Sequence, residues 1–81
     1  MYKAKIKVTL KKAVLDPQGK AIEAALSTLG FKHVQDVRVG KYIEMRIRDK
    51  DEKTVKAKVD EMCKKLLANP VIEDYEFTLG Q

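Results

Sequence analysis

Three scarcities in the sequence exclude whole classes of protein. The single cysteine, Cys63, excludes an internal disulfide and a metal site built from a cysteine cluster. No apolar run approaches the ~20 residues of a membrane span, and Met1 leads into alternating lysines and apolar residues instead of a signal peptide. The single histidine, His33, has no evident carboxylate or thiol companion, so we expect a surface residue and no nucleophile-and-base pair. We therefore expect a cytoplasmic protein that does not cross a membrane.

Positive charge is in excess, but its meaning depends on where it lies. The chain of 81 residues is short enough to form one domain, residues 1–81, and it carries a formal net charge of +5. A basic surface gains affinity for nucleic acid by releasing counterions, so a ferredoxin-like RNA-binding module is the alternative interpretation of the sequence. Lysine-rich surfaces also serve solubility alone. The charge therefore leaves this alternative open without favouring it.

Strict alternation of residue types predicts a strand at each end of the chain. Apolar residues at even positions from Tyr2 to Leu10 alternate with lysines, and Tyr75, Phe77 and Leu79 alternate with polar or acidic residues. Each strand should bury one face only. If the two strands are neighbours, their lysines and acidic residues should form cross-strand pairs.

Two helices are expected between these strands. The first runs from Pro17 to about Leu29, with Asp16 as its N-cap and Gly30 as its left-handed stop. The second fits Lys50 to about Ala68, with an N-cap pair formed by Asp49 and Glu52. Its buried face should consist of apolar residues at helical spacing, namely Val55, Val59, Met62, Cys63 and Leu66. Cys63 is then a small buried hydrophobe rather than a reactive thiol.

The middle of the chain favours one long strand, bent or bulged at Gly40. Apolar residues keep odd numbers from Val37 to Ile47, which a two-residue hairpin would not allow. A strand from Val34 to Arg48 would be about 50 Å long, whereas a globule of this size is roughly 30 Å across. We therefore expect a homo-oligomer, a dimer or a tetramer, whose sheets join through this strand.

The expected fold class is α+β. The element order is β-α-β-α-β, which indicates a two-layer sandwich with an antiparallel sheet and two helices on one of its faces. A break of the long strand at Gly40 would make this the order of a ferredoxin-like fold.

Two Gly-Lys pairs are the residues that the expected fold does not explain. Gly19 stands in the first turn of a helix, where it is roughly 1 kcal/mol worse than alanine, and Gly40 interrupts the long strand. Neither pair forms a phosphate loop, because Ala21 and Tyr42 follow the lysines where the pattern requires serine or threonine. A looser anion site at the first helix N-terminus stays open, with Lys20 and Lys11 or Lys12 adding charge, which would suit a regulatory domain.

A mixed face on the long strand favours a protein interface. It carries positive, negative and aromatic side chains, namely Asp36, Arg38, Tyr42, Glu44 and Arg46. A nucleic-acid groove would favour several exposed aromatic residues and uniform positive charge.

Four motifs in order along the chain resemble the PurS family, the small subunits of phosphoribosylformylglycinamidine synthase. They are LDPQGK from Leu15 to Lys20, the helix end Leu29-Gly30-Phe31, the stretch from Val37 to Lys41, and the stretch from Leu66 to Tyr75. The resemblance implies a subunit without catalytic residues or a cofactor of its own. Its implied partners are a PurL-type synthetase that uses ATP and magnesium, and a PurQ-type glutaminase that supplies ammonia.

The resemblance also implies which residues contact partners. Gln18, Gly19 and Lys20 match the first motif, and Arg38, Gly40 and Lys41 match a second one. With Asp36 and Tyr42 from the mixed face, they make up the expected interface. On this interpretation, a Gly19→Ala substitution should leave folding nearly intact and weaken assembly.

Overall fold

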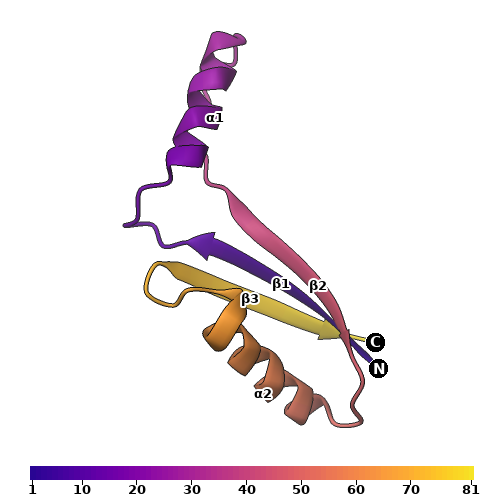
Figure 1. Cartoon of the computed structure of the whole chain (residues 1–81). Coiled ribbons are helices and arrows are strands. Elements are labelled where there is room, and N and C mark those ends of the chain that lie inside the picture. Colours follow the sequence, from indigo (N-terminus) through magenta and orange to yellow (C-terminus); the bar gives the residue numbers. More distant parts are fainter.

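A three-stranded antiparallel sheet organises the chain. The computed structural model describes all residues, 1–81, and its elements follow the order β1 (Tyr2–Leu10), α1 (Pro17–Thr28), β2 (Gly40–Ile47), α2 (Glu52–Met62), the π-helical turn η1 (Cys63–Leu67) and β3 (Glu73–Gly80). The strand order is β2-β1-β3, with β1 in the centre (Figure 1). Three antiparallel strands and two helices confirm the expected α+β, ferredoxin-like arrangement.

The terminal strands are neighbours, and they separate polar from apolar side chains as the alternation predicts. Ala4, Ile6 and Val8 of β1 are fully buried on one face, and the lysines of β1 lie on the other. On this open face Lys7 lies opposite Glu76 of β3 and opposite Tyr42 of β2. The expected cross-strand pairing of lysine with acidic residues is therefore present.

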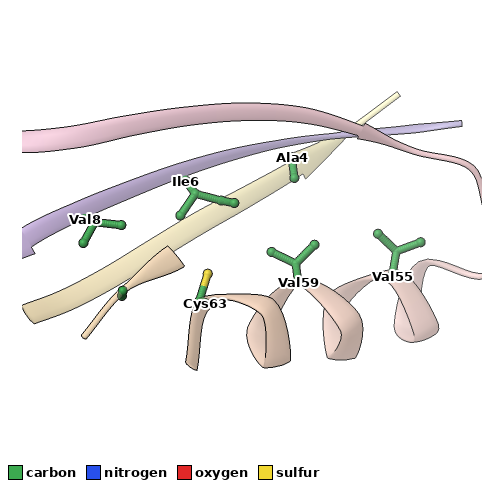
Figure 2. Packing of buried hydrophobic residues seen from close by; sticks show 7 residues of the cluster. Ala4, Ile6, Val8, Val55, Val59 and Cys63 are labelled. Carbon is green, nitrogen blue, oxygen red and sulfur yellow. The ribbon is translucent and has the colours of Figure 1, made fainter. Parts of the chain in front are cut away.

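Helix α2 covers the apolar face of the sheet. Val55 and Val59 of α2 and Cys63 at the start of η1 point toward the sheet and are fully buried (Figure 2). The burial of Cys63 confirms the expected role of a small hydrophobe, and burial raises the pKa of its thiol. Neither α1 nor α2 has the length and apolar character needed to cross a bilayer.

Both ends of the second helix differ from the expectation. Asp51 rather than Asp49 is the N-cap and accepts the N–H of Lys53, while Asp49 pairs with Lys58 at 2.9 Å. At the other end, the N–H of Ala68 donates to the carbonyl of Cys63, five residues back, and this bond widens the last turn. Leu67 therefore packs against the core, whereas Leu66, which we expected on the buried face, is 81% exposed.

Helix α1 does not lie on the sheet. It projects beyond one end of the sheet (Figure 1), so α2 alone forms the helical layer over the apolar face, which corrects the expected pair of helices. The molecule measures 51 × 26 × 14 Å with a radius of gyration of 16.2 Å, compared with the ~12 Å of a compact chain of this length. One consequence is that Gly19 is the only buried residue of α1.

Strand β2 is shorter than expected. It starts at Gly40, which pairs with Thr9 near the end of β1, so residues 34–39 have no strand opposite them. Asp36 has a φ of 58°, in the left-handed region, which also ends regular strand geometry. The expected strand from Val34 to Arg48 is therefore wrong in its first part, and Gly40 marks its start rather than a bend within it.

Candidate interface at the base of helix α1

One carboxylate joins the start of α1 to the chain that returns toward the sheet. Oδ1 of Asp16 accepts the N–H of Gly19 at 2.9 Å, and Oδ2 accepts the N–H of Val39 at 2.7 Å. Asp16 is 3% exposed. The bond from Gly19, followed by that from Val39, stabilises the charged form and lowers the pKa of Asp16 below its usual 3.8. The predicted N-cap is thus confirmed, and it has a second, long-range partner.

This carboxylate also fills the anion position of the helix. A helix N-terminus attracts an anion through its free N–H groups, and here the negative charge comes from Asp16 itself. The looser anion site that the sequence left open is therefore occupied from within the chain. Lys20 is exposed beside it and forms no ion pair.

Gly19 permits a close approach of two backbone segments. A Cβ placed on Gly19 would lie 2.1 Å from the carbonyl oxygen of Val37, far inside van der Waals contact. Because backbone cannot yield as a flexible side chain can, alanine at this position must displace the returning chain. The expectation that Gly19→Ala leaves folding nearly intact is therefore wrong, since the glycine is required by the fold.

Gly40 has a similar role at the start of β2. A Cβ there would lie 2.5 Å from the carbonyl oxygen of Val8 and 2.9 Å from the side chain of Thr9. Both residues belong to β1, the strand with which β2 pairs. Gly40 therefore lets β2 begin close against β1.

The side chains of Arg38 and Lys41 hold backbone carbonyls inside the molecule. Nη2 of Arg38 donates to the carbonyls of Lys11 and Val14, each at 2.8 Å, and so fixes the loop after β1. Nζ of Lys41 donates to the carbonyl of Leu67 at 3.2 Å and lies 3.8 Å from Glu73. The positive charge of Lys41 lies near the free carbonyls at the end of the second helix, where it stabilises that end. These two residues therefore have structural contacts that sequence reasoning did not foresee.

The other four residues of the expected interface are exposed. Gln18 and Lys20 lie on the first turns of α1, and Asp36 lines a hollow of about 470 Å³ together with Lys12 and Arg38. Tyr42 lies apart from them on the open face of the sheet, is 56% exposed, and donates its hydroxyl to Glu44 at 2.9 Å. The expected interface thus divides into four residues with structural roles, of which only Gly19 is buried, and four exposed residues without such a role that come from several elements.

Sequence reasoning did not foresee several uncovered apolar side chains. Exposed apolar side chains include Leu29, Phe31 and Leu66, at 72%, 58% and 81%. The helical pattern predicts a buried face for Leu66, and the expected position of the first helix on the sheet would cover its apolar residues, so the sequence did not indicate that Leu29 and Leu66 are uncovered. No group of three or more His, Cys, Asp or Glu side chains is arranged to hold a metal ion.

Known proteins resemble this chain over almost its whole length. The family model PurS, phosphoribosylformylglycinamidine (FGAM) synthase, matches residues 3–81. The FGAM synthase subunit PurS of Bacillus subtilis is 53% identical over 81 residues, which cover 100% of this chain and 95% of that protein. The same subunit of Methanocaldococcus jannaschii is 53% identical over 76 residues, covering 94% and 92%.

Solved structures agree with the sequence comparison. The structure of B. subtilis PurS covers 100% of both chains with a TM-score of 0.91 and 51% identity. A chain of PurLQS from Thermotoga maritima covers 98% of this chain and 96% of its own length, with a TM-score of 0.88 and 32% identity. Sequence, fold and length agree, and the chain belongs to the PurS family of phosphoribosylformylglycinamidine synthase.

Proposed function

We propose that this chain is the non-catalytic assembly subunit of phosphoribosylformylglycinamidine synthase in purine biosynthesis. It bridges a PurL-type synthetase subunit and a PurQ-type glutaminase subunit and aids the transfer of ammonia between them. The synthetase subunit uses ATP and magnesium to amidate formylglycinamide ribonucleotide. The observation that carries this proposal is the full-length likeness to a chain of the PurLQS structure from T. maritima.

The arrangement of the expected interface supports a binding role. Arg38 and Gly19 make the base of α1 rigid through backbone contacts, so that Gln18 and Lys20 are held exposed on it. We propose that Gln18, Lys20, Asp36 and Tyr42 contact partner subunits. Gly19, Gly40, Arg38 and Lys41 belong to the same interface by holding its shape, and the cytoplasm is the proposed location of the complex.

We also propose that the chain is a homo-oligomer, a dimer or a tetramer. The original reason, a strand too long for its domain, no longer holds because β2 ends within the sheet. The support is instead the projecting helix α1, of which only Gly19 is buried, and the uncovered Leu29 and Leu66. Apolar surfaces of this kind indicate a contact with another protein surface.

RNA binding has less support from the distribution of charge. Lys3 lies 3.8 Å from Glu44, and Lys11 lies 3.9 Å from Asp74, so part of the lysine charge is neutralised on the molecule itself. The open face of the sheet exposes Tyr42 as its one aromatic residue. A titration with single-stranded RNA at low salt is expected to give no shift.

The proposed function is tested by reconstitution with purified PurL-type and PurQ-type subunits. Glutamine-dependent formation of formylglycinamidine ribonucleotide should need this chain, while turnover with added ammonia should depend on it much less. A pull-down with and without ADP and glutamine reports assembly directly. Equal glutamine-dependent turnover in the absence of this chain would contradict the proposal.

A matched pair of variants locates the contact. Lys20→Glu reverses a charge on the exposed set and should weaken the pull-down, while Lys56→Glu makes the same change on an exposed position of α2 and should not. Neither lysine forms an ion pair, so neither variant should alter thermal unfolding by more than a few degrees. Equal binding by both variants would remove Lys20 from the interface.

A further inference from the structure

Arg38 is held in place by the fold but keeps most of its hydrogen-bonding capacity. Its guanidinium carries five N–H donors, and the two on Nη2 are used by the carbonyls of Lys11 and Val14, at 2.8 Å each. These bonds fix the plane of the group and leave the donors on Nη1 and Nε without a partner in the chain. Arg38 also forms no ion pair. A guanidinium in this state is prepared to bind an oxygen anion.

Arg38 lines a hollow together with two other charged residues. The hollow has a volume of about 470 Å³, and its lining consists of Lys12, Asp36 and Arg38. It is formed by the loop after β1 and the segment before β2, where α1 leaves the sheet (Figure 1). No apolar or aromatic residue lines it. The hollow therefore suits neither an apolar ligand nor the stacked base of a nucleotide.

Opposite charges line this hollow without meeting. Lys12 and Asp36 are exposed, and neither forms an ion pair with the other, with Arg38 or with any further residue. The buried carboxylate of Asp16 is bonded through both oxygens to backbone N–H groups and forms no ion pair with Arg38. The hollow thus has room for a group that pairs with charges of both signs.

The fold fixes the position of the negative charge as well. Asp36 has a φ of 58°, in the left-handed region, which aspartate adopts more readily than most residues. The next residue, Val37, is held by the close approach of its carbonyl to Gly19. With Arg38 bonded to two carbonyls, two of the three charged residues are ordered before anything binds. Such preorganisation lowers the entropy cost of binding.

A protein carboxylate with a cation beside it fits this hollow. The carboxylate can accept N–H donors from Arg38 and Lys12 together, and the neighbouring cation can pair with Asp36. A phosphate group fits less well, because it carries more than one negative charge and Asp36 would repel it. The arrangement of charges therefore favours a protein surface of mixed charge over a phosphorylated small molecule.

A second copy of this chain is a poor source of the carboxylate. The chain has a formal net charge of +5, so that the basic surfaces of two copies repel each other. Half of its 12 acidic residues already form ion pairs within one copy, namely Glu44, Asp49, Asp60, Glu61, Glu73 and Asp74. A different protein is the better complement to the hollow.

We propose that the hollow lined by Lys12, Asp36 and Arg38 binds a carboxylate of a partner subunit of the synthase, with a cation of the same partner against Asp36. This rests on the proposed function and specifies the chemistry of one contact. It adds Lys12 to the interface and gives Arg38 a second role, since Arg38 then holds the loop and also binds the partner. A contact of this kind speeds association and weakens as salt is added.

Zero-length cross-linking tests the contact directly. A carbodiimide joins a lysine amine to a carboxylate that touches it, and an amide forms. In the reconstituted complex we expect Lys12 to be joined to an aspartate, a glutamate or the C-terminus of a partner subunit, identified by mass spectrometry of peptides. Lys56 is exposed on α2 without an ion pair, and as the control it should be joined much less. Lys12→Arg keeps the charge but has no amine, so the complex should form without this cross-link.

Charge variants give an independent measurement. Lys12→Glu should weaken the pull-down about tenfold or more, whereas Lys12→Arg should retain it. Asp36→Asn, which keeps a residue type that tolerates a positive φ, should weaken the pull-down by a smaller factor because the cation loses its partner. Both positions are exposed, so thermal unfolding should move by no more than a few degrees. Arg38 is not substituted, because its loss would also release the loop after β1.

Two results would overturn the proposal. They are a pull-down that Lys12→Glu leaves unchanged, and a complex that forms without any cross-link to Lys12. Inorganic phosphate tests the other occupant, and calorimetry is expected to show no binding. Phosphate binding that Lys12→Glu abolishes and Asp36→Asn strengthens would assign the hollow to a small anion instead.

Reconstitution separates this proposal from the proposed function. Glutamine-dependent turnover that needs the chain but is unaffected by Lys12→Glu contradicts the contact alone. Turnover that is equal without the chain contradicts the proposed function itself, and with it the contact.

Discussion

The side chain of Asp16 reaches Val39 across 23 positions of sequence and accepts its N–H at 2.7 Å. The same carboxylate caps α1 through Gly19. Two backbone donors on separate segments are therefore satisfied by one buried side chain, which sets the angle at which α1 leaves the sheet. The two bonds join the helix and the residue before β2 into one rigid unit.

Replacing Asp16 should remove stability and its dependence on acid pH. Asp16→Ala loses both bonds and should lower Tm by roughly 5–10 °C. The pKa of Asp16 is lowered in the folded chain, so its contribution is complete above about pH 4, the unfolded value, and is lost as pH falls through the folded pKa. Thermal unfolding of Asp16→Asn from pH 6 downward should show a smaller acid loss than the unaltered chain. Identical pH profiles would contradict this role of Asp16.

Gly19→Ala should destabilise the fold. The helix gains about 1 kcal/mol from alanine, but the clash with the Val37 carbonyl costs more, about 1–3 kcal/mol or above, because backbone must move. Chemical denaturation measures the free energy of unfolding. Lys20→Ala, the next residue and exposed, is the control and should stay within about 0.5 kcal/mol of the unaltered chain. A more stable Gly19→Ala variant would show that the close approach to Val37 is not maintained.

Two valines give a direct test of where the core lies. Val59 is fully buried under the sheet, and Val71 is 81% exposed. Val59→Ala should lower the free energy of unfolding by roughly 2 kcal/mol through lost burial and the remaining cavity. Val71→Ala removes the same atoms and should cost less than about 0.5 kcal/mol. Similar losses from both variants would contradict the packing of α2 on β1.

Tyr75 should ionise well above the usual pKa of a tyrosine. Its hydroxyl donates to Asp60 at 2.6 Å, and this bond raises the pKa of Tyr75 to about 12. Because the folded pKa lies above the unfolded value of about 10, the stabilisation is complete below pH 10 and is lost as pH rises through about 12. An absorbance titration should contain this step, Tyr75→Phe should remove it, and Asp60→Asn should move it to lower pH. Circular dichroism at each pH checks that the chain is folded. A step unchanged in Asp60→Asn would exclude the bond as its cause.

Local patterns were sufficient for much of the fold. Alternation placed Ala4 and Ile6 on the buried face, and the Asp16-Pro17 pair and Gly30 marked both ends of α1. Gly30 has a φ of 102°, and the N–H of Phe31 donates to the carbonyl of Leu26, which is the expected helix stop. These features depend on neighbours within a few residues, and the sequence displays them directly.

Features that depend on a distant partner were not predictable in this way. The apolar parity of residues 37–47 continues through Gly40, but a strand also needs a neighbour, and pairing with β1 ends near Thr9. The free position of α1 likewise follows from the bond between Asp16 and Val39, which no local pattern contains. Periodicity alone therefore predicted too long a strand and a covered helix.

The sequence marks Gly19 and Gly40 as unusual positions but does not give the structural reason for either. Gly19 and Gly40 were singled out because the expected helix and strand did not need them, and both proved to be unusual positions. Glycine is needed at both positions because the backbone of Val37 approaches Gly19 closely and the backbone of Val8 approaches Gly40 closely, within the same chain. An absent side chain in a sequence indicates that something approaches closely, but it does not say whether the approaching group belongs to the same molecule.

The π-helical turn at Cys63–Leu67 has a consequence for how this chain can vary in length. A turn closed by a bond over five residues contains one residue more than the α-helical turn it replaces. Loss of one residue here, such as Leu66, would let α2 continue as a regular helix with the next leucine still directed to the core. Deletion of a single residue should therefore be tolerated at this turn more readily than anywhere within α2 or the strands.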